Sequence, residues 1–219
     1  MFSFLPSTNL KLYLPPSNAQ LNPKVFITIF QMIKGLTQKK QEKEDIENPK
    51  EGRPMIKFIK SLKKKDLVGV EIGSLYGFNA RSILLNLDIK KLYLIDPYEL
   101  YSEYLDITTP FAYFAKRKLQ EILKSFMNKI KMIKKASYDA VFDINESLDF
   151  VYIDGNHSYK YVLEDIENYW PLIKEGGILG GHDYYNTTKA REVKKAVDEW
   201  IETNKIKLYV DGIDWWVVK

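Results

Sequence analysis

One stretch of the sequence decides the fold: Val70-Glu71-Ile72-Gly73-Ser74-Leu75-Tyr76-Gly77-Phe78-Asn79-Ala80. It joins an apolar run at 67–72, which is typical of a buried strand, to a helix expected at 78–87. In an open parallel sheet, ligands bind at the carboxyl ends of the strands, where a glycine lets the backbone approach the ligand. Gly73 and Gly77 are placed for that role, so the stretch predicts a ligand-binding loop. The alternative is that they only form a tight strand-to-helix turn.

Strands and helices alternate from Pro54 onward, which predicts an α/β fold with a seven-stranded, mainly parallel sheet and helices on both faces. A helix is expected to begin at Pro54. The other expected elements are strands at 67–72, 91–95, 129–133, 148–153 and 177–180, and helices at 78–87, 110–126, 158–169 and 190–202. Two last strands, 207–210 and 215–218, flank Asp211-Gly212 and predict an antiparallel hairpin at the sheet edge.

The chain of 219 residues is 45% hydrophobic and 28% charged, which suits one compact domain with an extension. We assign 54–219 to the domain and 1–53 to an N-terminal extension, irregular or helical. Within the extension, 25–36 is expected to form a short apolar helix. That helix is interpreted as a lid over a pocket, an arm of a homodimer, or an addition to the core.

The composition excludes several kinds of site and partner. Cysteine is absent, so disulfides, a thiolate nucleophile and a Cys-ligated zinc site are excluded. The net charge is +4, yet only four basic residues are arginine, so a nucleic-acid partner is not favoured. The longest apolar run, 25–33, is too short for a membrane span, and 1–6 lacks a basic leader. A cytoplasmic protein is therefore expected.

An acid follows the second expected strand. Asp96 lies 19 residues after Gly77, where a carboxylate can accept two hydrogen bonds from a ribose diol. Position 75 is Leu, so the G-x-G-x-x-G pattern of a dinucleotide site is not met. The alternative is that Asp96 only caps the segment before Pro97. Together, the glycines and the acid favour a ligand that carries a nucleoside.

Two further acids follow the fourth and fifth strands. Asp154 and Asp183 are expected to meet in one crevice, where two carboxylates need a cation or a shared proton. Magnesium prefers oxygen ligands, so this pair predicts a divalent metal site. His157 is placed to accept a proton from a substrate hydroxyl, while His182 is interpreted as a group that orients Asp183 or ligates the metal. The alternative for Asp154 is a turn or helix cap.

These motifs resemble a known family. Glu71-x-Gly73-x-x-x-Gly77 with Asp96, and the closing hairpin, resemble class I S-adenosylmethionine-dependent methyltransferases. A second block is more specific and resembles the metal-dependent sugar O-methyltransferases of macrolide biosynthesis. It consists of Phe150-Val151-Tyr152-Ile153-Asp154-Gly155-Asn156-His157-Ser158-Tyr159, then Asp165 and Trp170-Pro171-Leu172, and finally Gly176 to Tyr184. The resemblance spans about 54–218 and implies a Rossmann-like sheet.

The resemblance implies roles for individual residues. Gly73 and Gly77 would pass under the methionine part of S-adenosylmethionine, and Glu71 would hold its amino end. Asp96 would bind the ribose, and Ser137 would contact the adenine. Ser74 and Asp154 are counted with these cofactor-binding residues. Asp154 and Asp183 would bind Mg²⁺ or another divalent ion with a third acidic ligand, for which Glu71 is a candidate. His157 would be the catalytic base, assisted by Asp154.

The resulting prediction is methyl transfer from S-adenosylmethionine to an oxygen of a small molecule, such as a sugar or polyol. One alternative is a methyltransferase that acts on nucleic acid or protein. A second is a non-catalytic protein of the same fold that binds the cofactor or serves as a structural subunit. Aromatic residues after Asp96, from Tyr98 to Phe114, are interpreted as a lid or acceptor wall, or as loop packing.

Overall fold

The computed structural model describes residues 52–98, 109–185 and 192–219, and at 109–113 only the backbone. The chain divides into two compact units, 1–40 and 41–219, and the described residues belong to the second. The expected helix at 25–36 and most of the aromatic segment after Asp96 lie outside the described residues. The division into an extension, 1–53, and a domain, 54–219, stays a prediction.

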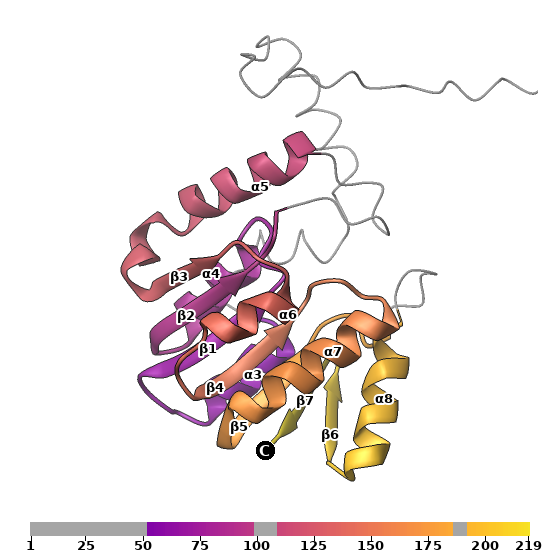
Figure 1. Cartoon of the computed structure of the whole chain (residues 1–219). Coiled ribbons are helices and arrows are strands. Elements are labelled where there is room, and N and C mark those ends of the chain that lie inside the picture. The colour runs from indigo at the N-terminus through magenta and orange to yellow at the C-terminus, as the bar shows by residue number, and fades with distance from the viewer. Residues whose placement is uncertain (1–51, 99–108, 186–191) are drawn as a thin grey trace, which may run out of the picture. The chain divides into compact units, whose positions relative to one another are not determined.

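The described residues form the predicted α/β sheet (Figure 1), and the predicted fold class is confirmed. The strand order is β3-β2-β1-β4-β5-β7-β6. Neighbouring strands are parallel from β3 to β5, while β7 is antiparallel to both β5 and β6. The strands are β1 (Leu67–Ile72), β2 (Ile89–Ile95), β3 (Ile130–Ile133), β4 (Leu148–Ile153), β5 (Ile173–Gly181), β6 (Leu208–Asp211) and β7 (Asp214–Val218).

Helices cover both faces of the sheet. Apolar side chains of α3, α4 and α5 pack into one core, and those of α6, α7 and α8 pack into another on the opposite face. The helices are α3 (Pro54–Ser61), α4 (Phe78–Asn86), α5 (Thr109–Ile122), α6 (Ser137–Ala140), α7 (Tyr159–Tyr169) and α8 (Val193–Asn204). Three short 3₁₀ helices are η1 (Lys124–Lys129), η2 (Val141–Asp143) and η3 (Trp170–Leu172).

Several expected boundaries differ from the structure, and two of them differ by four residues. The helix expected at 110–126 ends at Ile122 and continues as the 3₁₀ helix η1. The strand expected at 177–180 begins earlier, at Ile173, although Lys174 and Glu175 are exposed. Polar residues at the solvent-exposed start of a strand carry little pattern, so the sequence reveals only the buried part of β5.

Trp215 and Trp216 show why the hairpin belongs to the core. Because successive side chains of a strand point to opposite faces, Trp215 packs into the α6–α8 core and Trp216 into the α3–α5 core. Both are buried, since each face of β7 is covered. Trp216 also stacks on Tyr209 with ring centroids 6.0 Å apart and planes 5° apart.

Gly69 lets β1 pack closely in the centre of the sheet. A Cβ at this position would lie 2.1 Å from the ring of Phe150, which is buried on the neighbouring strand β4. The ring therefore fills the space that a side chain at Gly69 would need.

We expect Gly69→Ala to lower the free energy of unfolding by about 1–3 kcal/mol, because the added methyl group overpacks the core. Denaturant unfolding followed by circular dichroism measures this change. Lys90→Ala, at an exposed position of β2, is the control and should change the stability little. Equal stability of the Gly69→Ala variant and the parent protein would contradict the argument.

Candidate active site

The ends of β4 and β5 bring three predicted site residues together. His157 Nε2 lies 3.0 Å from Asp183 Oδ2 and 3.3 Å from Asp154 Oδ1. The strands fix this arrangement, because the backbone N–H of Asp154 donates to Ile72 and that of His182 to Ile153. The two acids expected to meet therefore lie close together, with the imidazole between them.

A cation that the sequence did not predict also belongs to this cluster. Arg53, assigned to the N-terminal extension, places Nη1 2.7 Å from Asp154 Oδ2 and donates to the hydroxyl of Tyr152 at 3.1 Å. Arg53 and Asp154 are 101 residues apart, and no local pattern links them. The Arg53 side chain is only 9% exposed, so the contact is largely shielded from water.

The Arg53 guanidinium and hydrogen bonds with His157 keep both acids charged. Burial alone would raise the pKa of Asp154, but Arg53 and His157 outweigh it and hold that pKa well below the usual range. Burial likewise acts to raise the pKa of Asp183, and the hydrogen bond with His157 brings it below the usual value. The site thus contains two ionised carboxylates compensated by groups of the protein itself.

His182 contacts a residue that the sequence did not predict as its partner. Its Nδ1 lies 2.7 Å from Asp214 Oδ1, and the hydroxyl of Tyr152 donates to the same oxygen at 2.9 Å. The other oxygen, Asp214 Oδ2, accepts from the backbone N–H of Met55 at 3.1 Å. Asp214 is completely buried and connects α3, β4, β5 and β7 beneath the site.

The donor set of the cluster fits a divalent cation. One ligand atom each from Asp154, His157 and Asp183 lies within 4.8 Å of the others, and two carboxylate oxygens with an imidazole nitrogen suit such an ion. Among the described residues, His157 and not Glu71 completes this group. The contacts of Arg53 and His157 already occupy carboxylate oxygens that a cation would use.

The predicted glycine loop is shaped by contacts within the chain. Gly73 and Gly77 have φ angles of 85° and 79°, in the left-handed region that favours glycine. A Cβ on Gly73 would lie 2.1 Å from the backbone oxygen of Asp154, and one on Gly77 would lie 2.9 Å from Leu119. The two glycines therefore let the end of β1 approach β4 and let α4 approach α5.

Asp96 holds the same loop from the end of β2. Its Oδ2 accepts from the backbone N–H of Leu75 at 2.9 Å, and its Oδ1 accepts from that of Tyr98 at 2.8 Å. Burial raises the pKa of Asp96, while these two bonds act to lower it. Each carboxylate oxygen has a further lone pair, so Asp96 can also accept from a ribose diol. The Tyr98 hydroxyl lies 3.4 Å from that of Ser74.

Glu71 and Asn79 form a buried polar pair between β1 and α4. Asn79 Nδ2 donates to Glu71 Oε1 at 2.9 Å, and both residues are buried. Within the described part of the chain, Asn79 Oδ1 is buried and accepts no hydrogen bond. A carboxylate and an amide oxygen are both acceptors, so the pair suits an ammonium group. The sequence did not single out Asn79.

Ser137 begins α6 and is held by α7. The hydroxyl of Tyr169 donates to the Ser137 backbone oxygen at 2.9 Å. Asp165 on α7 is 2% exposed. Burial raises the pKa of Asp165 to about 7, although the neighbouring Ser137 side chain acts to lower it. The expected contact of Ser137 with adenine stays a prediction.

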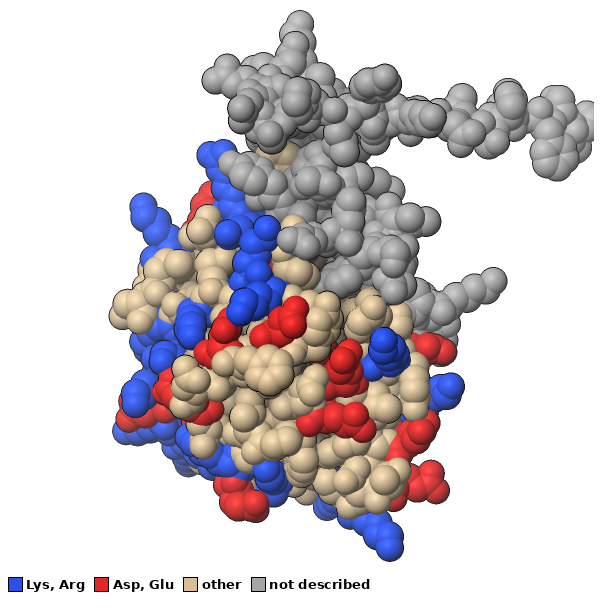
Figure 2. Space-filling model, in the orientation of Figure 1, with Lys and Arg blue, Asp and Glu red and all other residues tan. Residues whose placement is uncertain are grey.

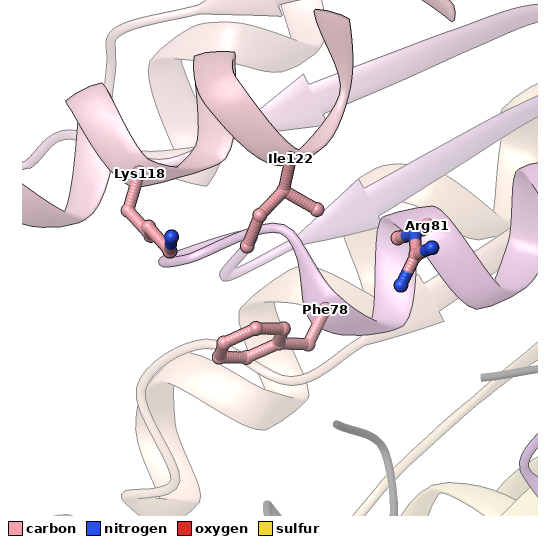
Figure 3. A pocket seen from close by; sticks show the side chains of 4 residues that line it. All are labelled: Phe78, Arg81, Lys118 and Ile122. Atoms are coloured by element: carbon pink, nitrogen blue, oxygen red, sulfur yellow. The ribbon is translucent and has the colours of Figure 1, made fainter. Parts of the chain in front are cut away.

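A pocket of about 400 Å³ lies between α4 and α5 (Figure 3). Phe78 and Arg81 line it from α4, and Lys118 and Ile122 from α5. None of the predicted site residues lines this pocket.

Among the described helices, none is both long and apolar enough to cross a membrane.

The sequence matches a family described as a methyltransferase domain over residues 70–184. This range contains the glycine loop, Asp96 and the Asp154–His157–Asp183 cluster. A curated relative is the uncharacterized protein R132 of Acanthamoeba polyphaga mimivirus, with 28% identity over 144 residues. That match covers 64% of this chain and 61% of the relative, so the chain spans less than two thirds of its length.

Solved structures with the same fold include an O-methyltransferase from Bacillus cereus in complex with SAH, with a TM-score of 0.55, 14% identity and coverage of 88% of this chain and 97% of that one. A second is the methyltransferase MycE of the mycinamycin pathway, in complex with Mg, SAH and mycinamycin VI. Its TM-score is 0.53 at 15% identity, and the match covers 75% of this chain and 48% of that one. A third is an rRNA methylase from Streptococcus thermophilus, with a TM-score of 0.53 and 16% identity. This match covers 75% of this chain and 94% of that one. At these identities the likeness shows the fold.

The buried Asp165 carboxyl predicts a pH dependence of stability. An unfolded Asp has a pKa of about 3.9 and the folded value is about 7, so between these values the folded state holds a proton that the unfolded state lacks. We therefore expect this residue to make the free energy of unfolding fall as the pH rises from about 4 to about 7.

Asp165→Asn should remove that part of the slope, measured as urea unfolding across this pH range. Glu167→Gln, an exposed substitution on the same helix, is the control. An unchanged slope in the Asp165→Asn variant would rule out the buried carboxyl as its source.

Proposed function

We propose that this chain, which belongs to the methyltransferase domain family, transfers a methyl group from S-adenosylmethionine to an oxygen of a small molecule. The family match confirms a methyltransferase domain, and the structural neighbours confirm the fold predicted from the resemblance to class I methyltransferases. S-adenosylmethionine as the methyl donor is part of the proposal. The acceptor and the requirement for a metal are part of the proposal. A sugar or other polyol is the acceptor class that we favour.

One observation supports oxygen methylation most strongly: a histidine lies between two ionised carboxylates at adjacent strand ends. Carboxylates only accept hydrogen bonds, so the Nε2 atom facing them carries the proton in a neutral imidazole. The lone pair then resides on Nδ1, which can take the proton of an acceptor hydroxyl. Asp154 and Asp183 orient the ring and stabilise the imidazolium that results.

The methyl donor would be held by groups around the glycine loop. Asp96 would accept hydrogen bonds from the ribose hydroxyls, and Glu71 with Asn79 Oδ1 would receive the amino group. Ser74 and the turn at Gly73 and Gly77 would lie along the methionine part. The sulfonium of S-adenosylmethionine is already a strong electrophile, so these residues contribute mainly by positioning it.

A divalent cation would be held by the carboxylates of Asp154 and Asp183. The MycE structure, which has the same fold and was solved with Mg, supports a test of this arrangement. When bound, such a cation lowers the pKa of a coordinated hydroxyl and orients it. His157 keeps its role as base in this proposal, because the two carboxylates are the ligands.

The main competitor is methylation of nucleic acid or protein. On the face shown in Figure 2, basic side chains gather toward the left, with a few acidic side chains among them, and acidic side chains predominate at the centre and right. Binding to a phosphate backbone uses a continuous positive surface, which the acidic side chains interrupt on this face. A non-catalytic role would leave the charged cluster without a chemical use. A cytoplasmic location and a homodimer stay predictions.

We expect the protein to bind SAH, and Asp96→Ala to weaken that binding by roughly tenfold to a hundredfold, because charge-assisted hydrogen bonds to the ribose are lost. Titration calorimetry with the full chain measures both affinities. Asp88→Ala, an exposed acid before β2, is the matched control. No heat with SAH at millimolar concentration would contradict the proposed methyl donor.

We expect His157→Ala to bind SAH and Mn²⁺ as the parent does but to transfer labelled methyl groups about 100-fold to 10,000-fold more slowly, since a general base is lost. The acceptors are a panel of sugars and polyols, and tRNA and rRNA are included to test the alternative of nucleic-acid methylation. A large loss of Mn²⁺ affinity would instead identify His157 as a metal ligand. Full activity would remove it as the base.

A further inference from the structure

Arg53 is the residue that precedes α3, and its side chain extends to the candidate cation site. Its Nη1 contacts Asp154 Oδ2 at 2.7 Å and donates to the Tyr152 hydroxyl at 3.1 Å. The guanidinium carbon also lies 5.7 Å from the centre of the Tyr152 ring, a cation–π distance. One arginine thus contacts one of the two acids proposed to hold a cation.

The position of Arg53 is fixed by contacts of the backbone at the start of α3 and by contacts of its side chain. The Arg53 backbone oxygen accepts from Lys57 in the first turn of α3, and the N–H of Met55 donates to Asp214. Tyr152 donates its proton to the same Asp214 carboxylate, so its hydroxyl oxygen is oriented to accept from Arg53. The arginine is therefore built into the domain and is unlike a solvated surface side chain.

Arg53 and a bound cation would compete for the Asp154 carboxylate. A divalent cation held by Asp154 and Asp183 needs their negative charge, and the Arg53 guanidinium neutralises part of it at Oδ2. Positive charges a few ångströms apart repel strongly when they are shielded from water. The guanidinium must therefore move from Asp154, or the cation must bind beside a resident positive charge.

We propose that Arg53 is the internal counter-ion of Asp154 and that divalent cations bind the Asp154–Asp183 pair only in competition with it. This inference rests on the cation in the proposed function. Arg53 then sets the affinity for the cation, and its release from Tyr152 links cation binding to the segment that begins α3.

The test compares Mn²⁺ binding to the full-length parent, Arg53→Gln and Arg53→Lys, measured by calorimetry and by electron paramagnetic resonance of free Mn²⁺. We expect Arg53→Gln to lower the Mn²⁺ dissociation constant by about tenfold or more, because a positive charge is removed next to the site. Arg53→Lys, which keeps the charge, should stay closer to the parent. Arg81→Gln on α4 is the matched control and should leave the affinity unchanged.

Tyr152→Phe provides a second route, because it removes the hydroxyl that accepts from Arg53 and keeps the buried ring. We expect it also to tighten Mn²⁺ binding, by a smaller factor. Unchanged or weaker Mn²⁺ binding by folded Arg53→Gln, or by Tyr152→Phe if Arg53→Gln does not fold, would overturn the inference.

SAH binding separates this result from the proposed function. If both Arg53→Gln and the parent bind SAH but neither binds Mn²⁺ at millimolar concentration, the inference and the cation fail while the methyl donor stands. If both bind Mn²⁺ equally tightly, only the inference fails.

Discussion

The candidate site depends on one constraint: two carboxylates at adjacent strand ends must be compensated where water has limited access. Parallel pairing of β4 and β5 places Asp154 and Asp183 together whatever their charge. Desolvation would push a proton onto one of them, and the guanidinium of Arg53 with the imidazole of His157 prevents this. The chemistry at this pair of acids therefore depends on which groups compensate their charge.

A second buried carboxylate, that of Asp214, is also compensated by the groups around it. Tyr152, His182 and the backbone of Met55 all direct a donor or ring nitrogen at Asp214, which begins β7. The carboxylate thereby fixes the start of α3, which in turn carries Arg53. Removing one member of such a buried network leaves the others with unmet hydrogen bonds, so the hairpin and the Asp154–His157–Asp183 cluster are energetically coupled.

Local patterns account for most of the fold and for part of the site. Buried strands such as 67–72 and 148–153 could be predicted to the residue, because their apolar runs end at glycine or acidic residues. The meeting of Asp154, His157 and Asp183 followed from strand order. Arg53 and Asp214 could not be predicted, because their partners are distant in sequence. The contact of His182 with Asp214 was missed for the same reason, since Asp214 lies on the neighbouring strand β7.

The placement of β7 between β5 and β6 has a consequence for assembly during synthesis. Among the strands that the structure describes, β6 pairs with β7 alone, so β6 has no neighbour until the later strand emerges. Domains generally fold from the N-terminal side as they leave the ribosome, and here the five parallel strands can pair first. Asp214 arrives with the inserted strand, so the hydrogen-bond network next to Asp154 and Asp183 stays incomplete in a nascent chain until β7 has left the ribosome.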